Sequence, residues 1–322
     1  MPEKNTIMNT NTRHNLFTKP INILLLSMLC TALWGSAFPC VKIGYQLFSI
    51  AAEDTSGKLV FAGIRFFFAG VITLIISTVQ NHKIPLLRPH NVKGVLMVSL
   101  VQTVLQYIFF YIGLSNITGV KGSILAACNS FFVVLLAHFF YKNDRLSISK
   151  IIGCSIGFAG IILVNLNGMS SADLGFNLSG DGLMLFAALS FAIGSLISKN
   201  VCQKADATIV TGYQLGIGGL VLMLLGFLSG GRLSQVTFPG ILLLAYMSLL
   251  SSIAFTVWTI LSKYNKISRI AVYNFLTPIF GALLSALFLG DALFSWNSLL
   301  ALALVCIGIY IVNAGKRENA QK

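Results

Sequence analysis

Long runs of apolar residues, separated by short polar joints, repeat along the whole chain. Each run is close to the ~20 residues that a helix needs to cross the hydrocarbon core of a bilayer. A helix satisfies its own backbone hydrogen bonds, so it is the expected structure for such runs in lipid. The pattern therefore predicts an all-α membrane protein with ten transmembrane helices, at 21–42, 60–79, 93–114, 119–141, 149–167, 182–201, 207–229, 239–262, 268–289 and 295–314.

The first apolar run needs a separate decision, because it follows Lys19 and could be a secretory signal. It is longer than a typical signal core and lacks a small-x-small cleavage site. It also continues through Pro39 to Lys42. We therefore expect a retained first helix.

The composition supports lipid as the main solvent of this chain. Hydrophobic residues make up 56% of the sequence and charged residues only 10%, against roughly 25% charged residues in soluble domains. A soluble fold would have too little polar surface to cover such a core. The 6 cysteines are scattered without CxxC or CxxH spacing, so we interpret them as small buried apolar residues and expect neither metal nor cofactor.

The distribution of charge decides the orientation. A net charge of +13 could indicate a nucleic-acid-binding protein. With a cytoplasmic N-terminus, however, the cytoplasmic segments hold 17 of the 22 basic and four of the 9 acidic residues, and the other face holds five of each. The whole excess lies on one side, as the positive-inside rule requires. We expect a multi-pass protein of the cell membrane with both termini cytoplasmic, and its basic face to meet anionic lipids, not nucleic acid.

The two halves of the chain resemble each other at a nearly constant offset. Residues 130–146 align with 277–293 at an offset of 147, and Tyr107–Tyr111 aligns with Phe255–Thr259 at 148. Arg65 aligns with Gln214 at an offset of 149. A repeat of five helices is odd-numbered, so the second copy must enter the membrane upside down. Inverted repeats are typical of secondary transporters, whose solute site lies near the midplane between the repeats.

This repeat divides the chain into four parts. A cytoplasmic N-terminal tail at 1–20 precedes the first five-helix repeat at 21–168. The second, inverted repeat follows at 181–315, and a cytoplasmic tail closes the chain at 316–322.

Several short motifs occur in a fixed order along this duplicated plan. They are Trp34–Phe38, Arg65–Phe66, Tyr107, Lys142–Ser147 and the stretch from Thr277–Pro278 to Leu289–Leu293. In these motifs the chain resembles the drug/metabolite transporter superfamily, specifically its EamA-type ten-helix permeases, over roughly residues 21–315. It departs from the family at Asn143–Leu146, where Gly-Glu-Arg-Leu is usual. The resemblance implies a metabolite exporter or importer, commonly for amino acids or related compounds.

Polar side chains within the apolar runs are the candidates for solute binding, because polar groups in hydrocarbon are costly and often functional. Two large rings with polar tips, at similar depth, are suited to line the same pocket. The candidates are Trp34, Gln102, Gln106, Tyr107, Asn129, Ser190, Ser251, Ser252, Asn274 and Thr277. The alternative is that these groups only join helices by hydrogen bonds.

Three further residues carry a charge or can gain one. Lys42 and Arg65 lie toward the outer side, where they could attract an anionic group of the solute. Alternatively, they extend to the headgroups or pair with a loop acid such as Asp291. His138 lies one turn from the cytoplasmic end of its helix, as a proton relay or as an interfacial structural histidine.

The sequence lacks the features that an enzyme or an ATP-driven pump would need. No run carries an acidic residue at its midplane, and no phosphate-binding loop or nucleophile–base pair is present. We therefore expect no enzyme and no ATP drive. The leading hypothesis is a facilitative or exchange transporter of a small solute by alternating access, as a monomer or homodimer. The alternatives are a proton-coupled drug or metabolite exporter and a membrane-bound binding or sensory protein.

Overall fold

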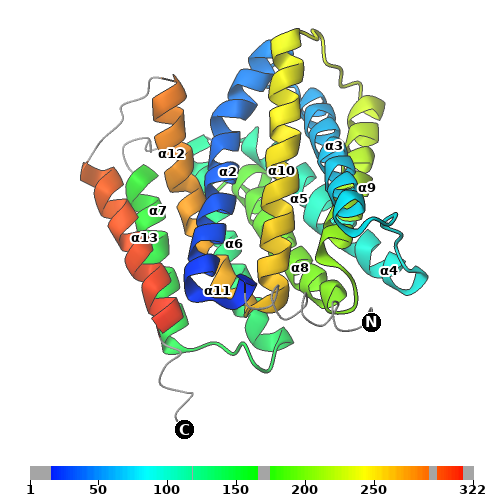
Figure 1. Ribbon diagram of the computed structural model, residues 1–322. Coiled ribbons are helices and arrows are strands. Elements are labelled where there is room, and N and C mark those ends of the chain that lie inside the picture. Colours follow the sequence, from blue (N-terminus) through cyan, green and yellow to red (C-terminus); the bar gives the residue numbers. More distant parts are fainter. Residues whose placement is uncertain (1–15, 118, 166–174, 290–295, 315–322) are drawn as a thin grey trace, which may run out of the picture.

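The computed structural model describes residues 16–117, 119–165, 175–289 and 296–314, and this part of the chain consists of helices and connecting loops, without strands (Figure 1). The first repeat holds α2 (Pro20–Leu47), α3 (Thr55–Asn81), α4 (Pro89–Val98), η1 (Ser99–Leu105), α5 (Gln106–Leu114), α6 (Gly119–Phe140) and α7 (Ile148–Asn165). The second holds η4 (Leu178–Gly182), α8 (Leu183–Lys204), α9 (Ala207–Leu228), α10 (Phe238–Tyr264), α11 (Ile267–Ala271), η5 (Val272–Phe275), α12 (Leu276–Leu289) and α13 (Trp296–Ala314).

Each predicted span coincides with a helical segment. Eight segments are long and apolar enough to cross a membrane, and the two remaining ones have shorter apolar cores, Ile148–Leu163 and Leu299–Ala314. Several helices extend beyond the predicted bounds. The second span begins at Thr55 instead of 60, because Asp54 caps it by accepting a hydrogen bond from Gly57 N at 2.7 Å.

Two of the spans are interrupted by segments that are not α-helical. The third contains a π-helical stretch, η1, and the ninth contains the 3-10 turn η5 between α11 and α12. Such departures from α-helix are frequent at functional sites in membrane-spanning helices. They carry two of the candidate residues, Gln102 in η1 and Asn274 in η5.

Repeat-related helices pack against each other as antiparallel pairs. A Cβ atom added to Gly63 of α3 would overlap Met223 of α9, and one added to Gly70 would overlap Gly216. Residue numbers thus rise along α3 while those of the contacted residues in α9 fall, so the two helices are antiparallel. The same close approach joins α7 to α13, because a Cβ atom added to Gly153 would lie 2.7 Å from the carbonyl oxygen of Gly308. Both pairs lie side by side in Figure 1. Equivalent helices that run in opposite directions are the direct mark of inverted repeats.

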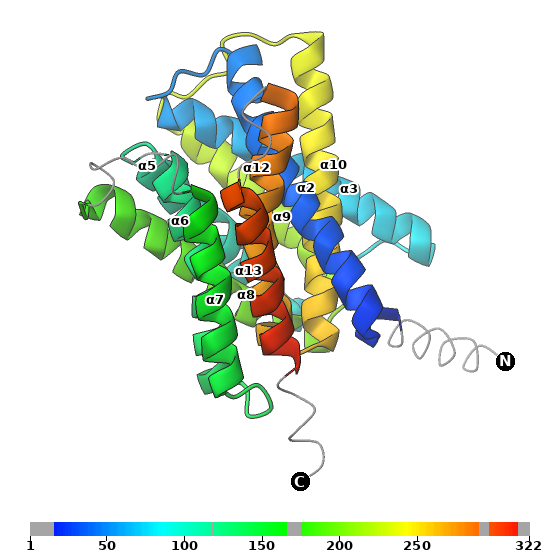
Figure 2. The ribbon, with the colours of Figure 1, turned by 90° about the vertical axis from the view of Figure 1, so that its left-hand side faces the viewer.

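The other helix contacts also come in repeat-related pairs. The first helix of one repeat packs on the fourth of the other, α2 on α12 and α8 on α6. The third span of the second repeat, α10, packs on α2 and α3, and the third span of the first repeat packs on α8 and α9. Figure 2 shows α2, α10 and α12 together in the middle of the molecule. The fold class predicted from the sequence is therefore confirmed.

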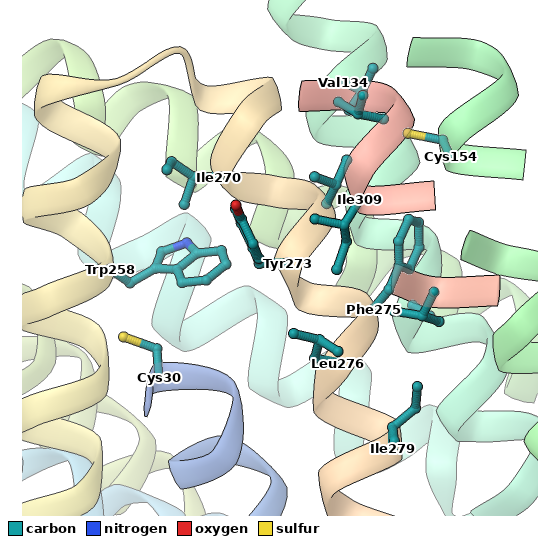
Figure 3. Close-up of a cluster of buried hydrophobic side chains, with 14 of the residues drawn as sticks. Cys30, Val134, Cys154, Trp258, Ile270, Tyr273, Phe275, Leu276, Ile279 and Ile309 are labelled. Atoms are coloured by element: carbon teal, nitrogen blue, oxygen red, sulfur yellow. The ribbon is translucent and has the colours of Figure 1, made fainter. Parts of the chain in front are cut away.

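The largest buried apolar cluster joins both repeats. It contains Trp258, Tyr273 and Phe275 of the second repeat together with Cys30 and Cys154 of the first (Figure 3). Many large apolar side chains on the outside of the bundle stay exposed, as a lipid-facing surface requires. All six cysteines are free, and Cys30, Cys154 and Cys202 are buried. The exposed Cys306 is an exception to the expectation that all would be buried.

Candidate solute-binding site

Arg65 is a buried charged residue inside a membrane-spanning helix. It is the eleventh of the 27 residues of α3, about 15 Å from the start of that helix. Only 5% of Arg65 is exposed, and its Nε donates to Ser251 Oγ on α10 at 2.8 Å. The predicted span begins at residue 60 and puts Arg65 only five residues inside it. The observed helix begins at Thr55, because Asp54 caps it there. The observed burial contradicts extension to the headgroups.

A connected set of aromatic rings begins at Phe66, whose centroid is 4.9 Å from the guanidinium carbon of Arg65. The Tyr107 ring packs on Phe66 with 4.4 Å between centroids, and Phe66 contacts Phe255 of the other repeat at 6.1 Å. Trp34 then meets Phe255 edge-on at 5.4 Å. Of the predicted candidates, Ser251 therefore contacts Arg65 directly. Tyr107 is connected to it through Phe66, and Trp34 through Phe255 and Phe66, where α2, α3, α5 and α10 meet.

Two other predicted candidates join helices to each other. Gln102 donates from Nε2 to Ser195 Oγ on α8 at 3.0 Å, and both residues are buried. The Ser252 hydroxyl pairs with that of Thr73 on α3 at 2.7 Å. In both cases the polar group is satisfied between helices, as the alternative interpretation expected.

Two candidates have polar atoms that remain without a partner. Gln106 Oε1 and Thr277 Oγ1 are buried, and neither has a hydrogen-bond partner in the described part of the chain. Gln106 directly precedes Tyr107 at the start of α5. Because buried polar atoms are nearly always satisfied, these two are the strongest candidates for contact with a bound molecule after Arg65.

Asn129, Ser190 and Asn274 lie on other helices. Asn129 on α6 accepts from Ser130 Oγ at 3.1 Å, and Ser130 Oγ is 3.0 Å from the carbonyl of Ala271. This second contact connects α6 with the segment that carries Asn274, which is 7% exposed. Ser190 is a buried residue of α8. Trp34 packs against the clusters on both sides and connects this region with the surroundings of Arg65.

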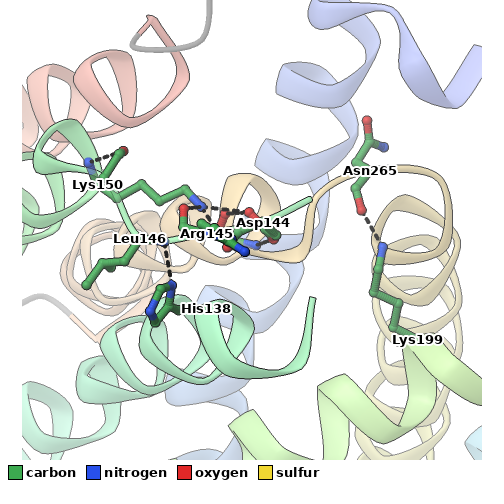
Figure 4. Close-up of polar contacts among 9 residues, drawn as sticks. His138, Asp144, Arg145, Leu146, Lys150, Lys199 and Asn265 are labelled. Atoms are coloured by element: carbon green, nitrogen blue, oxygen red, sulfur yellow. Dashed lines mark hydrogen bonds and ion pairs between the residues drawn. The ribbon is translucent and has the colours of Figure 1, made fainter. Parts of the chain in front are cut away.

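The remaining two candidates lie apart from this centre. Lys42 is exposed on α2. His138 accepts a hydrogen bond at Nδ1 from Leu146 N at 3.1 Å, so it holds the loop after α6 (Figure 4). Asp291, named as a partner for the outer cations, lies outside the described residues.

Asp144 is a residue that the sequence analysis did not single out for a role. Its buried carboxylate accepts hydrogen bonds from the amide and the hydroxyl of Ser268, at the start of α11, and pairs with Lys150 Nζ at 2.7 Å. Nearby, Lys199 donates to the carbonyls of Ser262 and Asn265 (Figure 4). The contacts of Asp144 tie the loop after α6 to α7 and α11, and those of Lys199 tie α8 to the end of α10. The motif at Asn143–Leu146 was the available signal for this role.

The described residues hold no group of His, Cys, Asp or Glu that could bind a metal. The region around Arg65 contains this cation, several hydroxyl and amide groups and several aromatic side chains. This chemistry is suited to binding a small polar molecule and supplies no nucleophile–base pair.

Several known proteins with similar sequences are named as transporters. The sequence pattern of the EamA-like transporter family matches residues 21–166 and 178–314. The chain is 29% identical to the uncharacterized transporter YvbV of Bacillus subtilis (strain 168), over 93% of each chain. It is 26% identical to the uncharacterized inner membrane transporter YedA of Escherichia coli (strain K12), over 88% of each chain. A solved crystal structure superposes with a TM-score of 0.76 at 17% identity, covering 93% of this chain and 99% of the other. That likeness shows the fold alone.

Proposed function

The chain belongs to the EamA-like transporter family, and on that premise we propose that it carries amino acids or related metabolites across the cell membrane by alternating access. It is a multi-pass membrane transporter of a small solute and not an enzyme. The substrate class and the mechanism are our proposal. So are the cytoplasmic position of both termini and the location of the solute site between the repeats.

The observation that carries this proposal is the antiparallel pairing of repeat-related helices around a polar and aromatic centre. Because α3 pairs with α9 and α7 with α13, an exchange of conformations between the repeats would turn an opening on one side into an opening on the other. Arg65, Gln106 and Ser251 lie on helices of the two repeats that meet at this centre. A sensory protein has no need for two mirrored halves.

The proposed energy source is the gradient of the solute itself, or exchange for another solute. None of the 9 acidic residues of the sequence falls in the middle of a span, and proton-driven pumps usually carry a carboxylate there. The rival proton-coupled exporter would need His138 or an acidic residue at the surface end of a span as its coupling group. The Nδ1 of that side chain is engaged by the backbone of Leu146, which favours a structural role.

Reconstitution in liposomes tests the proposal. Purified full-length protein should take up at least one of a panel of labelled amino acids down its concentration gradient, with internal and external pH equal. Uptake that stops when a proton gradient is collapsed, while the solute gradient remains, would contradict uncoupled transport. Uptake of labelled sugars or nucleobases alone would contradict the substrate class.

A pair of substitutions tests the position of the site. Asn129→Ala and Asn274→Ala should weaken solute affinity by about five- to a hundredfold, because each lost hydrogen bond costs about 1–3 kcal/mol. The melting temperature in detergent should change little. If both variants melt early and the surviving protein keeps its affinity, the two asparagines only join helices.

A further inference from the structure

Arg65 is a buried cation that forms no ion pair with any other described residue. The described residues form two ion pairs, Lys121 with Asp181 and Lys150 with Asp144, and Arg65 takes part in neither. An uncompensated charge inside a membrane protein is costly. Such a residue therefore marks a place where an anion can supply the missing charge.

The guanidinium group is held in one orientation by its neighbour on α10. Ser251 Oγ accepts from Arg65 Nε at 2.8 Å and gives its own hydrogen to Met247 O at 2.8 Å. The terminal nitrogens Nη1 and Nη2 have no hydrogen-bond partner in the described part of the chain. Two parallel donors at the end of a fixed, planar cation match the two oxygens of a carboxylate.

Three tyrosines belong to the cluster next to this charge. Tyr45, Tyr107 and Tyr111 come from two helices of the first repeat and pack in the same apolar cluster as Phe66, whose ring centroid is 4.9 Å from the guanidinium carbon of Arg65. Tyr45 and Tyr107 are only half-buried. A phenolic hydroxyl donates to carboxylate oxygens, so these groups can add hydrogen bonds to those of the guanidinium.

The second repeat has a neutral residue, Gln214, at the position that corresponds to Arg65. Gln214 is the counterpart of Arg65 at an offset of 149, and Thr103 is the counterpart of Ser251 at 148. Gln214 donates from Nε2 to Thr103 Oγ1 at 3.0 Å, and both are buried. The contact between repeats is thus made twice, once with a neutral amide and once with a cation. Joining the helices does not require the charge.

We propose that Arg65, oriented by Ser251 and assisted by the surrounding tyrosines, binds a carboxylate group of the transported solute. The ligand class is a small organic carboxylate whose apolar part lies against the half-buried aromatic residues Trp34 and Tyr107. The site selects such anions over their neutral amides and over cations. This inference rests on the proposed function, since it concerns the same central site.

Chemical labelling of Arg65 in the intact protein tests the site directly. Phenylglyoxal reacts with accessible arginines, and mass spectrometry of the Arg65 peptide reports the extent of reaction. L-phenylalanine or 3-phenylpropanoate should slow the reaction at least about tenfold, and L-phenylalaninamide or 3-phenylpropanamide should not. The exposed Arg232 should react equally with and without these compounds. An Arg65 that does not react, or that acids and amides protect equally, would overturn the inference.

The two acids also identify the source of the carboxylate. Protection by L-phenylalanine alone indicates an amino acid as the ligand. Equal protection by 3-phenylpropanoate shows that an ammonium group is not needed. Either result supports the carboxylate site.

Arg65→Gln places the residue of the second repeat at the same position of the first and is therefore compatible with this fold. Its ratio of acid to amide binding, measured from the shift in melting temperature with the same four compounds, should fall by about ten- to a hundredfold. Arg65→Lys should recover part of the ratio, because the charge returns without the paired donors. Arg232→Gln, which removes an exposed charge, should keep the wild-type ratio. An unchanged ratio in Arg65→Gln would overturn the inference.

The two proposals can fail separately. If carboxylates protect Arg65 but no solute crosses the liposome membrane, transport by this mechanism fails and the carboxylate site stands. If solutes cross and Arg65→Gln keeps the wild-type preference for acids, transport stands and the carboxylate site fails.

Discussion

Gly70 of α3 and Gly216 of α9 lie in contact at the crossing of two repeat-related helices. A methyl group added to Gly70 would overlap the backbone of Gly216, and one added to Gly216 would meet only Gly70 Cα at 3.9 Å. The two repeats therefore approach each other with no room for a side chain on one partner. Gly219, about one turn after Gly216, is the counterpart of Gly70 at an offset of 149. Gly70 therefore touches α9 close to its own counterpart, which places this contact near the axis that relates the two halves.

The asymmetry of this contact predicts different effects of the same substitution. Gly70→Ala should lower the free energy of unfolding by about 1–3 kcal/mol, because the overlapping atoms belong to the backbone of α9 and cannot turn away. Gly216→Ala adds a methyl group at an ordinary contact distance and should change stability by less than about 1 kcal/mol. Thermal unfolding of the two variants in the same detergent measures both. Equal destabilisation would show that the helices cross elsewhere.

Ser251 is predicted to stabilise the fold through Arg65. Ser251→Ala leaves Arg65 Nε buried without a partner, so stability should fall by about 1–3 kcal/mol. Ser248 offers a matched control one turn earlier, because its hydroxyl donates only to Leu244 O of its own helix. Ser248→Ala should cost less than half as much in the same melting experiment. If both variants melt alike, the contact between Arg65 and Ser251 does not contribute.

Asp144 is predicted to hold the loop after α6 against the start of α11. Asp144→Asn removes the charge that pairs with Lys150 and replaces one acceptor by a donor facing Ser268. Breaking a buried pair of this kind should destabilise by about 3 kcal/mol. Asp206, an exposed N-terminal cap of α9, is the control, because asparagine caps a helix as well as aspartate does. A melting temperature of Asp144→Asn equal to that of Asp206→Asn would contradict this role.

The orientation in the membrane can be measured at the two ends of α3. Single cysteines at positions 53 and 83, in a variant without the native cysteines, should react differently with a membrane-impermeant thiol reagent added to whole cells. Both Glu53 and Lys83 are exposed. Position 53 should react from outside, and position 83 only after the membrane is opened, because the basic excess lies on the side of Lys83. The reverse result would invert the proposed topology.

The sequence by itself determined the number of spans, their order and the inverted relation of the repeats. Hydrophobic length fixes where a helix crosses a bilayer, and an odd number of spans in each repeat fixes the inversion. Charge position leads to an expected orientation. These properties follow from the exchange between lipid and water, which acts on each segment separately, so they can be predicted without knowing which helices touch.

Tertiary structure decided what each polar residue does. Gln102 and Gln106 are one helical turn apart, yet the first binds Ser195 and the second has an unpartnered Oε1 within the described residues. Arg65 donates a hydrogen bond to Ser251, which lies 186 residues later in the sequence. A polar residue in a span must meet a hydrogen-bond partner or a ligand, but its partner lies on another helix. Which of the two it meets depends on the rotation and packing of that helix, and the apolar pattern of a single span does not contain this information.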